Sequence, residues 1–121
     1  MTRINVGVLP IELPDKLLLA EHREIKRIPN VVKSGRFSLA NQPKSFTLGT
    51  GHVKFLYNRL LYLRKRYEAI HTECLIRGFN VTNYISAWDG VSDEFMGDYA
   101  PTEHDRELII ERITSKGWSL I

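Results

Sequence analysis

The chain has 121 residues, of which 43% are apolar and 26% charged, with a formal net charge of +3. These values are typical of one soluble globular domain, so we expect a single domain over residues 1–121. They exclude a membrane-spanning helix, because no run of ~18 apolar residues is present. The N-terminal stretch is too short and interrupted for a signal peptide, which predicts a cytoplasmic protein whose lone cysteine, Cys74, stays reduced.

The basic residues are concentrated in the first two thirds of the chain. Residues 1–77 hold 14 Lys and Arg against 6 Asp and Glu, whereas residues 78–121 hold 3 against 8. A basic excess gathered in one part of a domain is typical of a polyanion-binding protein, with nucleic acid the first candidate. The alternative at this point is an ordinary solvated surface.

The first predicted elements are an extended arm and a helix. Residues 1–13 contain proline and no helical period, and we interpret them as an extended arm. Pro14 suits the first turn of a helix and Asp15 suits its positive end, which predicts a helix from 14 to about 28. Pro29 disfavours a helical conformation at the residue before it, so the helix is expected to end there or slightly further on.

Two carboxylates interrupt the apolar face of this helix. At about 100° per residue, that face is formed by Leu17, Leu18, Ile25 and Ile28. Glu21 falls in its middle, and Glu24 lies on its border with a basic stripe that contains Arg27. Half-buried carboxylates are paired, hydrogen-bonded or functional. A structural ion pair, either Glu24 with Arg27 or Glu21 with an arginine from elsewhere, is one interpretation, and a functional carboxylate is the other.

A long loop and the most regular helix come next. Residues 30–51 are rich in Ser, Gly, Asn, Gln and Pro and are interpreted as a loop. The segment 52–77 carries apolar residues at 3,4 spacing without a break, which predicts one continuous core helix that ends at Gly78. Its stripe consists of Val53, Leu56, Leu60, Leu63, Tyr67, Ile70 and Cys74.

The last third combines an irregular segment with a third helix. Residues 80–101 carry aromatic residues that are expected to cover the helices, and their acidic residues lack the spacing of a calcium loop. Thr102 is a good N-cap, and Gly117 marks a helix end, so we predict a helix between them. Arg112 and Lys116 lie four residues apart on one face of its C-terminal part.

Conventional catalytic signatures are absent from the sequence. It contains no phosphate-binding or dinucleotide-binding glycine motif, and its histidines and Cys74 lack the spacing of a zinc site. Cys74 belongs to a core stripe, which disfavours a thiol nucleophile. An enzyme with this sequence would need an unconventional nucleophile.

Several segments together suggest that this nucleophile is the chain's own N-terminal amine. Met1 precedes Thr2, a small residue that allows removal of the initiator methionine. With this start occur A-E-H-R-E-I-K-R at 20 to 27, F-T-L-G-T-G-H-V-K-F-L-Y at 46 to 57, L-R-K-R at 63 to 66, E-C-L-I-R-G-F-N at 73 to 80 and G-D-Y-A-P at 97 to 101. In these segments and their order the chain resembles the phage-type pyrimidine-dimer DNA glycosylase/AP lyase family. The family is historically called endonuclease V of the UV-repair kind and is distinct from the deoxyinosine nuclease of similar name.

The resemblance implies a fold and a set of site residues. The fold would be all-α, a compact domain of three helices with long irregular loops. The α-amine of Thr2 would attack C1′ of the damaged nucleotide to form an imine, and Glu24 would assist proton transfers through β-elimination. Residues implied in DNA binding are Arg3, Arg23, Arg27, Arg112 and Lys116. The flipped nucleotide would lie opposite the lesion.

Elementary chemistry agrees with this assignment. An α-amine has an ordinary pKa of about 7.7 to 8.0, and neighbouring guanidinium groups disfavour its cationic form. Guanidinium groups also bind phosphate, which brings the sugar towards the amine. We therefore expect a monomeric enzyme without a metal or organic cofactor, acting on double-stranded DNA that contains a lesion or an abasic site.

Three differences from the family pattern leave alternatives open. Leu17 stands where the family usually has a histidine, the first loop is shorter, and the C-terminal aromatic run is reduced to Trp118. A glycosylase/AP lyase with an altered lesion range, and a DNA-binding module without turnover, are the alternatives. Salt-sensitive DNA binding without product would indicate the latter.

Overall fold

The computed structural model describes residues 2–121, so that Met1, whose removal the small residue Thr2 allows, lies outside the described residues. Five α-helices are present in this range: α1 (Asp15–Glu24), α2 (Arg27–Ser34), α3 (His52–Leu56), α4 (Leu60–Ile76) and α5 (Glu103–Ser115). Short 3-10 helices are η1 (Pro10–Glu12), η2 (Gly49–Gly51), η3 (Ile85–Trp88) and η4 (Asp93–Phe95). Residues 2–121 contain no β-strand, which confirms the all-α class.

The first expected helix is divided into α1 and α2. The prediction that Pro29 would end the helix is wrong, because Pro29 lies in the first turn of α2 and Ile28 before it is helical. A proline in a first turn lacks only an N–H that has no partner within the helix, and its ring prevents a bond to the carbonyl of Ile25. The turn between the two helices lies at residues 25 and 26, before the proline, and the loop begins at Gly35 and not at residue 30.

The second expected helix is also divided, at residues 57–59. Arg59 leaves helical geometry with φ −124° and ψ 43°. The amides of Leu61 and Tyr62, which open α4, both donate to the carbonyl oxygen of Gly97 at 3.1 and 3.2 Å. A carbonyl from a distant segment therefore caps α4 in place of a preceding helical turn, and this contact is invisible in the local apolar period.

The predicted end of α4 at Gly78 and the predicted start of α5 at Thr102 are confirmed. Gly78 adopts φ +83° after α4, and the amide of Phe79 donates to the carbonyl of Cys74 at 2.9 Å, which is a glycine-based C-cap. Thr102 and Asp105 form a reciprocal capping box at the start of α5.

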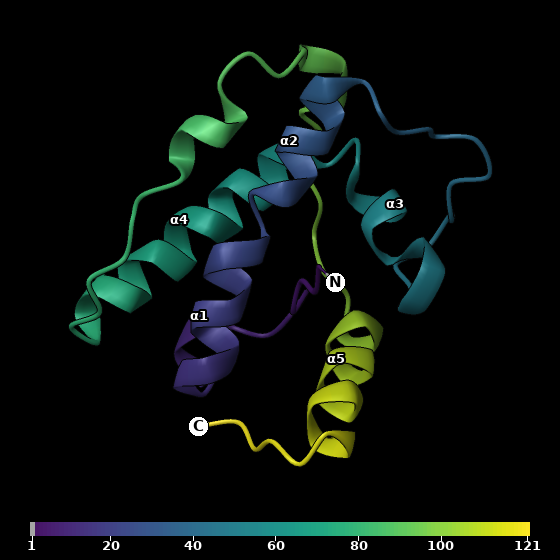
Figure 1. The fold of residues 1–121 in the computed structure, drawn as a ribbon. Helices are drawn as coiled ribbons and strands as arrows, with labels where there is room; N and C mark the ends of the chain where they lie inside the picture. The colour runs from purple at the N-terminus through teal and green to yellow at the C-terminus, as the bar shows by residue number, and fades with distance from the viewer. Residues whose placement is uncertain (1) are drawn as a thin grey trace.

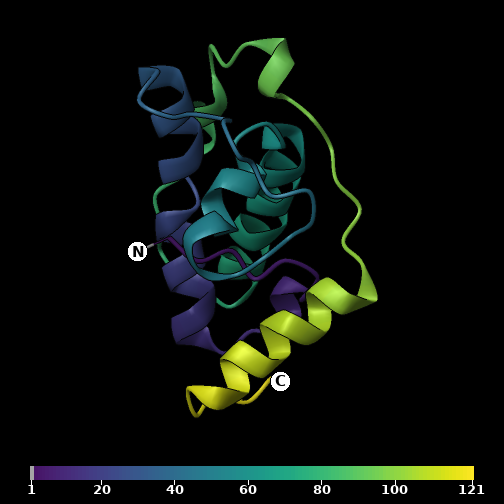
Figure 2. The same ribbon diagram turned by 90° about the vertical axis from the view of Figure 1, so that its right-hand side faces the viewer.

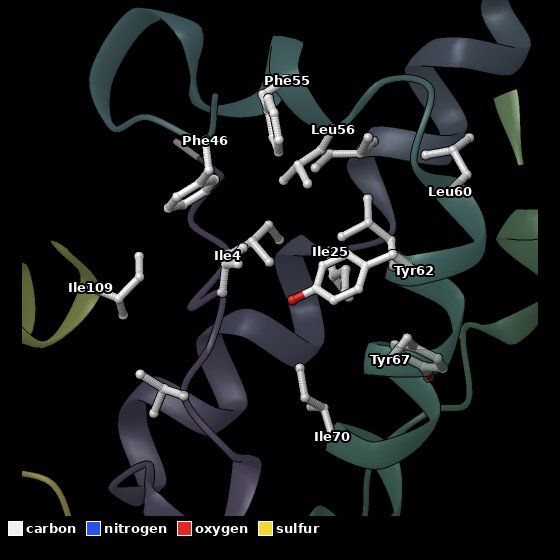
Figure 3. Close-up of a cluster of buried hydrophobic side chains, with 14 of the residues drawn as sticks. Ile4, Ile25, Phe46, Phe55, Leu56, Leu60, Tyr62, Tyr67, Ile70 and Ile109 are labelled. Carbon is white, nitrogen blue, oxygen red and sulfur yellow. The ribbon is translucent and has the colours of Figure 1, made fainter. Parts of the chain in front are cut away.

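The N-terminal arm passes through the core. Its residues Ile4, Val6 and Val8 are fully buried. Figure 3 shows Ile4 among side chains from separate segments, including Ile25, which follows the last residue of α1, and Ile109 of α5. The aromatic segment covers the helices as expected, and the buried indole of Trp88 donates to the carbonyl of Leu60 at 3.0 Å.

The helices surround the arm. α1 packs along α4, and α5 lies across one end of the molecule, as Figure 1 and Figure 2 show from two directions. The arm runs between α1 and α5 and brings the N-terminal end of the chain to the gap between them. None of the described helices is long and apolar enough to cross a membrane.

Candidate active site

The start of the described chain lies against the Glu24 side chain. The backbone N–H of Arg3 donates to Oε1 of Glu24 at 3.2 Å, and this carboxylate is only partly exposed at 16%. Because the Arg3 amide is bonded to the carbonyl carbon of Thr2, the hydrogen bond places Thr2 beside Glu24. Arg23 lies on the other side, with Nη2 3.9 Å from Oε2 of Glu24.

Glu21 has a different environment three residues earlier. Its fully buried carboxylate receives two hydrogen bonds from the guanidinium of Arg66, one of them between Nη2 and Oε1 at 2.9 Å. It also accepts the side-chain amide of Asn5 at 2.7 Å. The interpretation of Glu21 as a structural ion pair with an arginine from elsewhere is confirmed.

Asn5 connects this buried pair to α5. Its Oδ1 accepts a hydrogen bond from Nη2 of Arg112 at 2.8 Å, while its Nδ2 donates to Glu21. Burial lowers the pKa of the Arg112 guanidinium from its ordinary value, and the charge of Glu21 opposes this effect. Arg112 is thus a partly desolvated cation that is fixed in direction by a neutral amide.

Two cavities open on this group of residues. The larger, of about 580 Å³, is lined by Thr2, Arg3, Leu48, Gly49, Thr50, His52, Arg112 and Lys116. The smaller, of about 70 Å³, is lined by Arg3, Asn5, Leu17, Ala20, Glu21, Glu24, Arg112, Ile113, Lys116 and Trp118. Arg3, Arg112 and Lys116 belong to both, so the two cavities share a cationic wall. Such a wall is suited to phosphate oxygens.

The structure brings together five of the seven residues that the sequence singled out. Thr2, Arg3, Glu24, Arg112 and Lys116 line the two cavities. Arg23 is next to Glu24 but mostly exposed, at 60% of its side chain. Arg27 is an exposed residue in the first turn of α2, outside the lining of both cavities.

Two of the residues that differ from the family pattern also lie at the smaller cavity. Leu17, where a histidine was expected, and Trp118, the one aromatic residue left in the tail, both line the smaller cavity. The wall of this cavity therefore has an apolar side chain, Leu17, at the position where the resemblance implies a histidine. Lys116 is the C-cap of α5 and is exposed to solvent.

Two residues of the site were not predicted from the sequence. Asn5 lies in an arm without periodicity, and no local signal marks it. His52 lies in the segment 46–57 and lacks the spacing of a zinc ligand, and the sequence assigns it no other role; the structure shows it buried at 5% exposure and accepting the N–H of Ile4. In the described part of the chain, no three His, Cys, Asp or Glu side chains are gathered closely enough to hold a metal ion.

The fold and the site together define an all-α protein whose N-terminal arm opens into a cationic cavity beside a carboxylate. The family model described as pyrimidine dimer DNA glycosylase matches residues 1–86. The chain belongs to this family of DNA repair enzymes. The matched part contains Thr2, Arg3, Arg23, Glu24 and Arg27, whereas Arg112 and Lys116 lie beyond it on α5.

Proposed function

We propose that this protein is a glycosylase with AP-lyase activity that acts on UV-induced pyrimidine dimers in double-stranded DNA and uses the α-amine of Thr2 as its nucleophile. The observation that carries the proposal is the hydrogen bond from the Arg3 amide to Glu24. It places Thr2, which becomes N-terminal once Met1 is removed, beside a carboxylate at the edge of the cationic wall.

The reaction begins with attack by the neutral amine on C1′ of the damaged nucleotide. The glycosidic bond breaks as the new C–N bond forms. Its electron pair goes to the base nitrogen, which takes up a proton, and the base stays joined to the other pyrimidine of the dimer. Opening of the sugar ring then gives an imine between the Thr2 nitrogen and C1′. The cationic wall favours the neutral amine and holds the flanking phosphates, as it would in any polyanion site.

Glu24 acts in the second stage as a general base and acid. It accepts a proton from C2′, the C3′–O bond breaks, and the phosphate leaves as the strand is cut. Water then hydrolyses the conjugated imine and restores the amine. Every step needs only the amine, one carboxylate and water, so no metal or organic cofactor takes part.

An altered lesion range is the second candidate function. Leu17 and Trp118 give the small cavity an apolar part next to its cationic wall. This difference affects which damaged base is accommodated more than it affects the lyase step, which acts on the sugar. Comparison of cleavage at cyclobutane dimers and at abasic sites distinguishes the two candidates.

Borohydride trapping tests the nucleophile. Reduction of the imine in the presence of abasic-site DNA is expected to leave a covalent complex whose adduct maps to the Thr2 nitrogen by mass spectrometry. The Thr2→Gly variant still permits methionine removal and should also be trapped, because the amine and not the hydroxyl reacts. The Thr2→Leu variant is expected to retain Met1 and to show no trapping at the blocked position.

Absence of trapping by protein that has lost Met1 would overturn the imine mechanism. If such protein still bound lesion DNA tightly and with strong salt dependence, a DNA-binding module without turnover would replace it. The mass of the intact protein shows in each sample whether Met1 has been removed.

A further inference from the structure

Three consecutive amides of the N-terminal arm donate to three different side chains. The N–H of Arg3 donates to Glu24 at 3.2 Å, the N–H of Ile4 to Nε2 of His52 at 2.9 Å, and the N–H of Asn5 to Oε1 of Glu21 at 3.2 Å. The arm belongs to no helix or strand at this point. Side chains of α1 and α3 therefore satisfy the amides of Ile4 and Asn5, which would otherwise be buried without partners, and fix the exposed amide of Arg3.

The two partners of His52 determine its tautomer. Its Nδ1 lies 3.2 Å from the carbonyl oxygen of Thr47, which can only accept, so Nδ1 carries the hydrogen. Its Nε2 faces the N–H of Ile4, which can only donate, so Nε2 presents a lone pair. A proton on Nε2 would set two N–H groups against each other.

The surroundings of the ring favour this neutral form. Burial lowers the pKa of His52 to about 4, the carbonyl of Thr47 opposes the shift, and the nearby charges of Arg112 and Glu21 act in opposite directions. The ring also packs edge-on against buried Phe46, with centroids 5.3 Å apart. At neutral pH the imidazole is thus an oriented acceptor that is held on several sides.

Both ring nitrogens of His52 are occupied by structural partners, which argues against a role in proton transfer. The ring nevertheless lines the same cavity as Thr2. Ile4 is fully buried and only two residues from the nucleophile, so a shift of its amide changes where the Thr2 amine lies. Rates of this kind of reaction depend on ångström-scale placement of the attacking atom.

We propose that His52 is a positioning residue that aims the Thr2 amine by accepting the Ile4 N–H, together with the two carboxylates of α1. This role rests on the proposed function, because it concerns the placement of the nucleophile assigned there. It differs from that function in making a residue of α3, whose two ring nitrogens are engaged by backbone groups, control the rate of imine formation.

Single-turnover borohydride trapping on abasic-site DNA measures this placement. The His52→Leu variant removes the acceptor and should form the imine about 10- to 100-fold more slowly. The His52→Gln variant keeps an acceptor near the position of Nε2 and should recover most of the rate. Affinity for DNA with a tetrahydrofuran site, which cannot form an imine, should be the same in both variants and the wild type. The control is His104→Gln, an exposed residue of α5, which should match the wild type throughout.

The outcomes separate the two proposals. A wild-type protein without Met1 that is not trapped overturns the proposed function and this role with it. A trapped wild type with an equally fast His52→Leu variant overturns the role of His52 alone. Loss of rate and of tetrahydrofuran-site affinity in parallel would also count against it, because a general loss of structure has that effect.

Nuclear magnetic resonance of the unsubstituted protein gives a test that needs no variant. An N–H···N hydrogen bond between Ile4 and His52 should produce a scalar coupling between the two nitrogens. The ring nitrogens should show the Nδ1–H tautomer at neutral pH. A missing coupling, or the Nε2–H tautomer, would contradict the proposal even if the His52→Leu variant did not fold.

Discussion

Two carboxylates three residues apart on α1 have separate environments and therefore separate roles. Glu21 is fully buried, and Arg66 and Asn5 hold both of its oxygens. Glu24 is partly exposed, accepts one backbone N–H and lines a cavity. Removal of one partner from a buried pair costs about 3 to 5 kcal/mol, so Glu21 contributes to the stability of the fold. Glu24, which lines a cavity, is the carboxylate that we propose for proton transfer.

The Glu24→Gln variant separates chemistry from binding. Glutamine keeps an acceptor for the Arg3 amide but cannot accept a proton as a carboxylate does. We expect strand scission at abasic sites to slow by at least about 100-fold, with binding to a tetrahydrofuran-site duplex unchanged. The matched control is Glu68→Gln, a 59% exposed glutamate of α4 that pairs with Arg64, and it should retain full activity. Unchanged scission by Glu24→Gln would remove Glu24 from the mechanism.

At the scale of residues, the sequence could predict a role only where a residue interrupts a local apolar pattern. The position of Glu21 within an apolar stripe indicated a buried ion pair, and the structure supplies Arg66 as its partner. Asn5 and His52 gave no such signal, because their partners lie 16 and 48 positions away along the chain. Contacts of this kind follow from the tertiary fold and not from any short-range period. The roles of Thr2, Glu24 and the cationic residues stay predictions.

At the scale of elements, the predicted helices were confirmed as segments but not as continuous rods. The stripe on 52–77 is buried from Leu56 to Cys74, as the period predicted. The break at residues 57–59 depends on Gly97, whose carbonyl caps α4. Arg59 folds back over the break, where its Nη1 donates to the carbonyl of Phe55 at 2.6 Å and its guanidinium lies over the Phe55 ring. Sequence periodicity reports which face is buried, and it cannot report a cap that arrives from 36 residues away.

The Gly97→Ala variant tests this capping contact. A Cβ at Gly97 would lie 2.5 Å from the carbonyl oxygen of Asn58, so the backbone must move. We expect a loss of about 1 to 3 kcal/mol in the free energy of unfolding, measured by urea denaturation. Gly35→Asn is the control, because a Cβ there meets nothing within 4 Å and asparagine tolerates its positive φ. Equal stability of Gly97→Ala and the wild type would show that the start of α4 does not depend on this close approach.

At the scale of the whole molecule, α5 adds two basic residues to a site whose other residues come mostly from the basic first two thirds of the chain. Arg112 and Lys116 lie beyond the residues matched by the family model, yet they share a cavity wall with Arg3. The bond between Asn5 and Arg112, and the two bonds between Glu12 and Arg106, join α5 to the arm. The assignment of 1–121 to a single domain stays a prediction.

The dependence of stability on pH is a property of the whole fold. Burial lowers the pKa of both His22 and His52 to about 4 from 6.5, and His22 also hydrogen-bonds to His71 at 3.0 Å. The unfolded chain binds protons at these histidines below pH 6.5, whereas the folded chain does so only near pH 4. Their stabilising effect is therefore complete above pH 6.5 and is lost as pH falls towards 4, by at most about 3 kcal/mol for each residue.

The carboxylate of Glu12 adds a further loss of stability at lower pH. The hydrogen bond from Arg106 lowers the pKa of Glu12 from 4.5 to about 2, so its contribution is present above pH 4.5 and lost as pH falls from there to 2. Urea denaturation between pH 8 and 3 should thus show a plateau, a first decline through the histidine window and a second below it. The His52→Gln variant should make the first decline shallower, with the part due to His22 remaining. This holds whatever the variant's stability at pH 8, because the slope of the unfolding free energy against pH depends on the difference in bound protons between the unfolded and folded states. The Glu12→Gln variant should flatten only the second decline. Constant stability between pH 6.5 and 4.5 would show that neither imidazole is held neutral by the fold, and the lone pair that His52 offers to the Ile4 amide would then lose its physical basis.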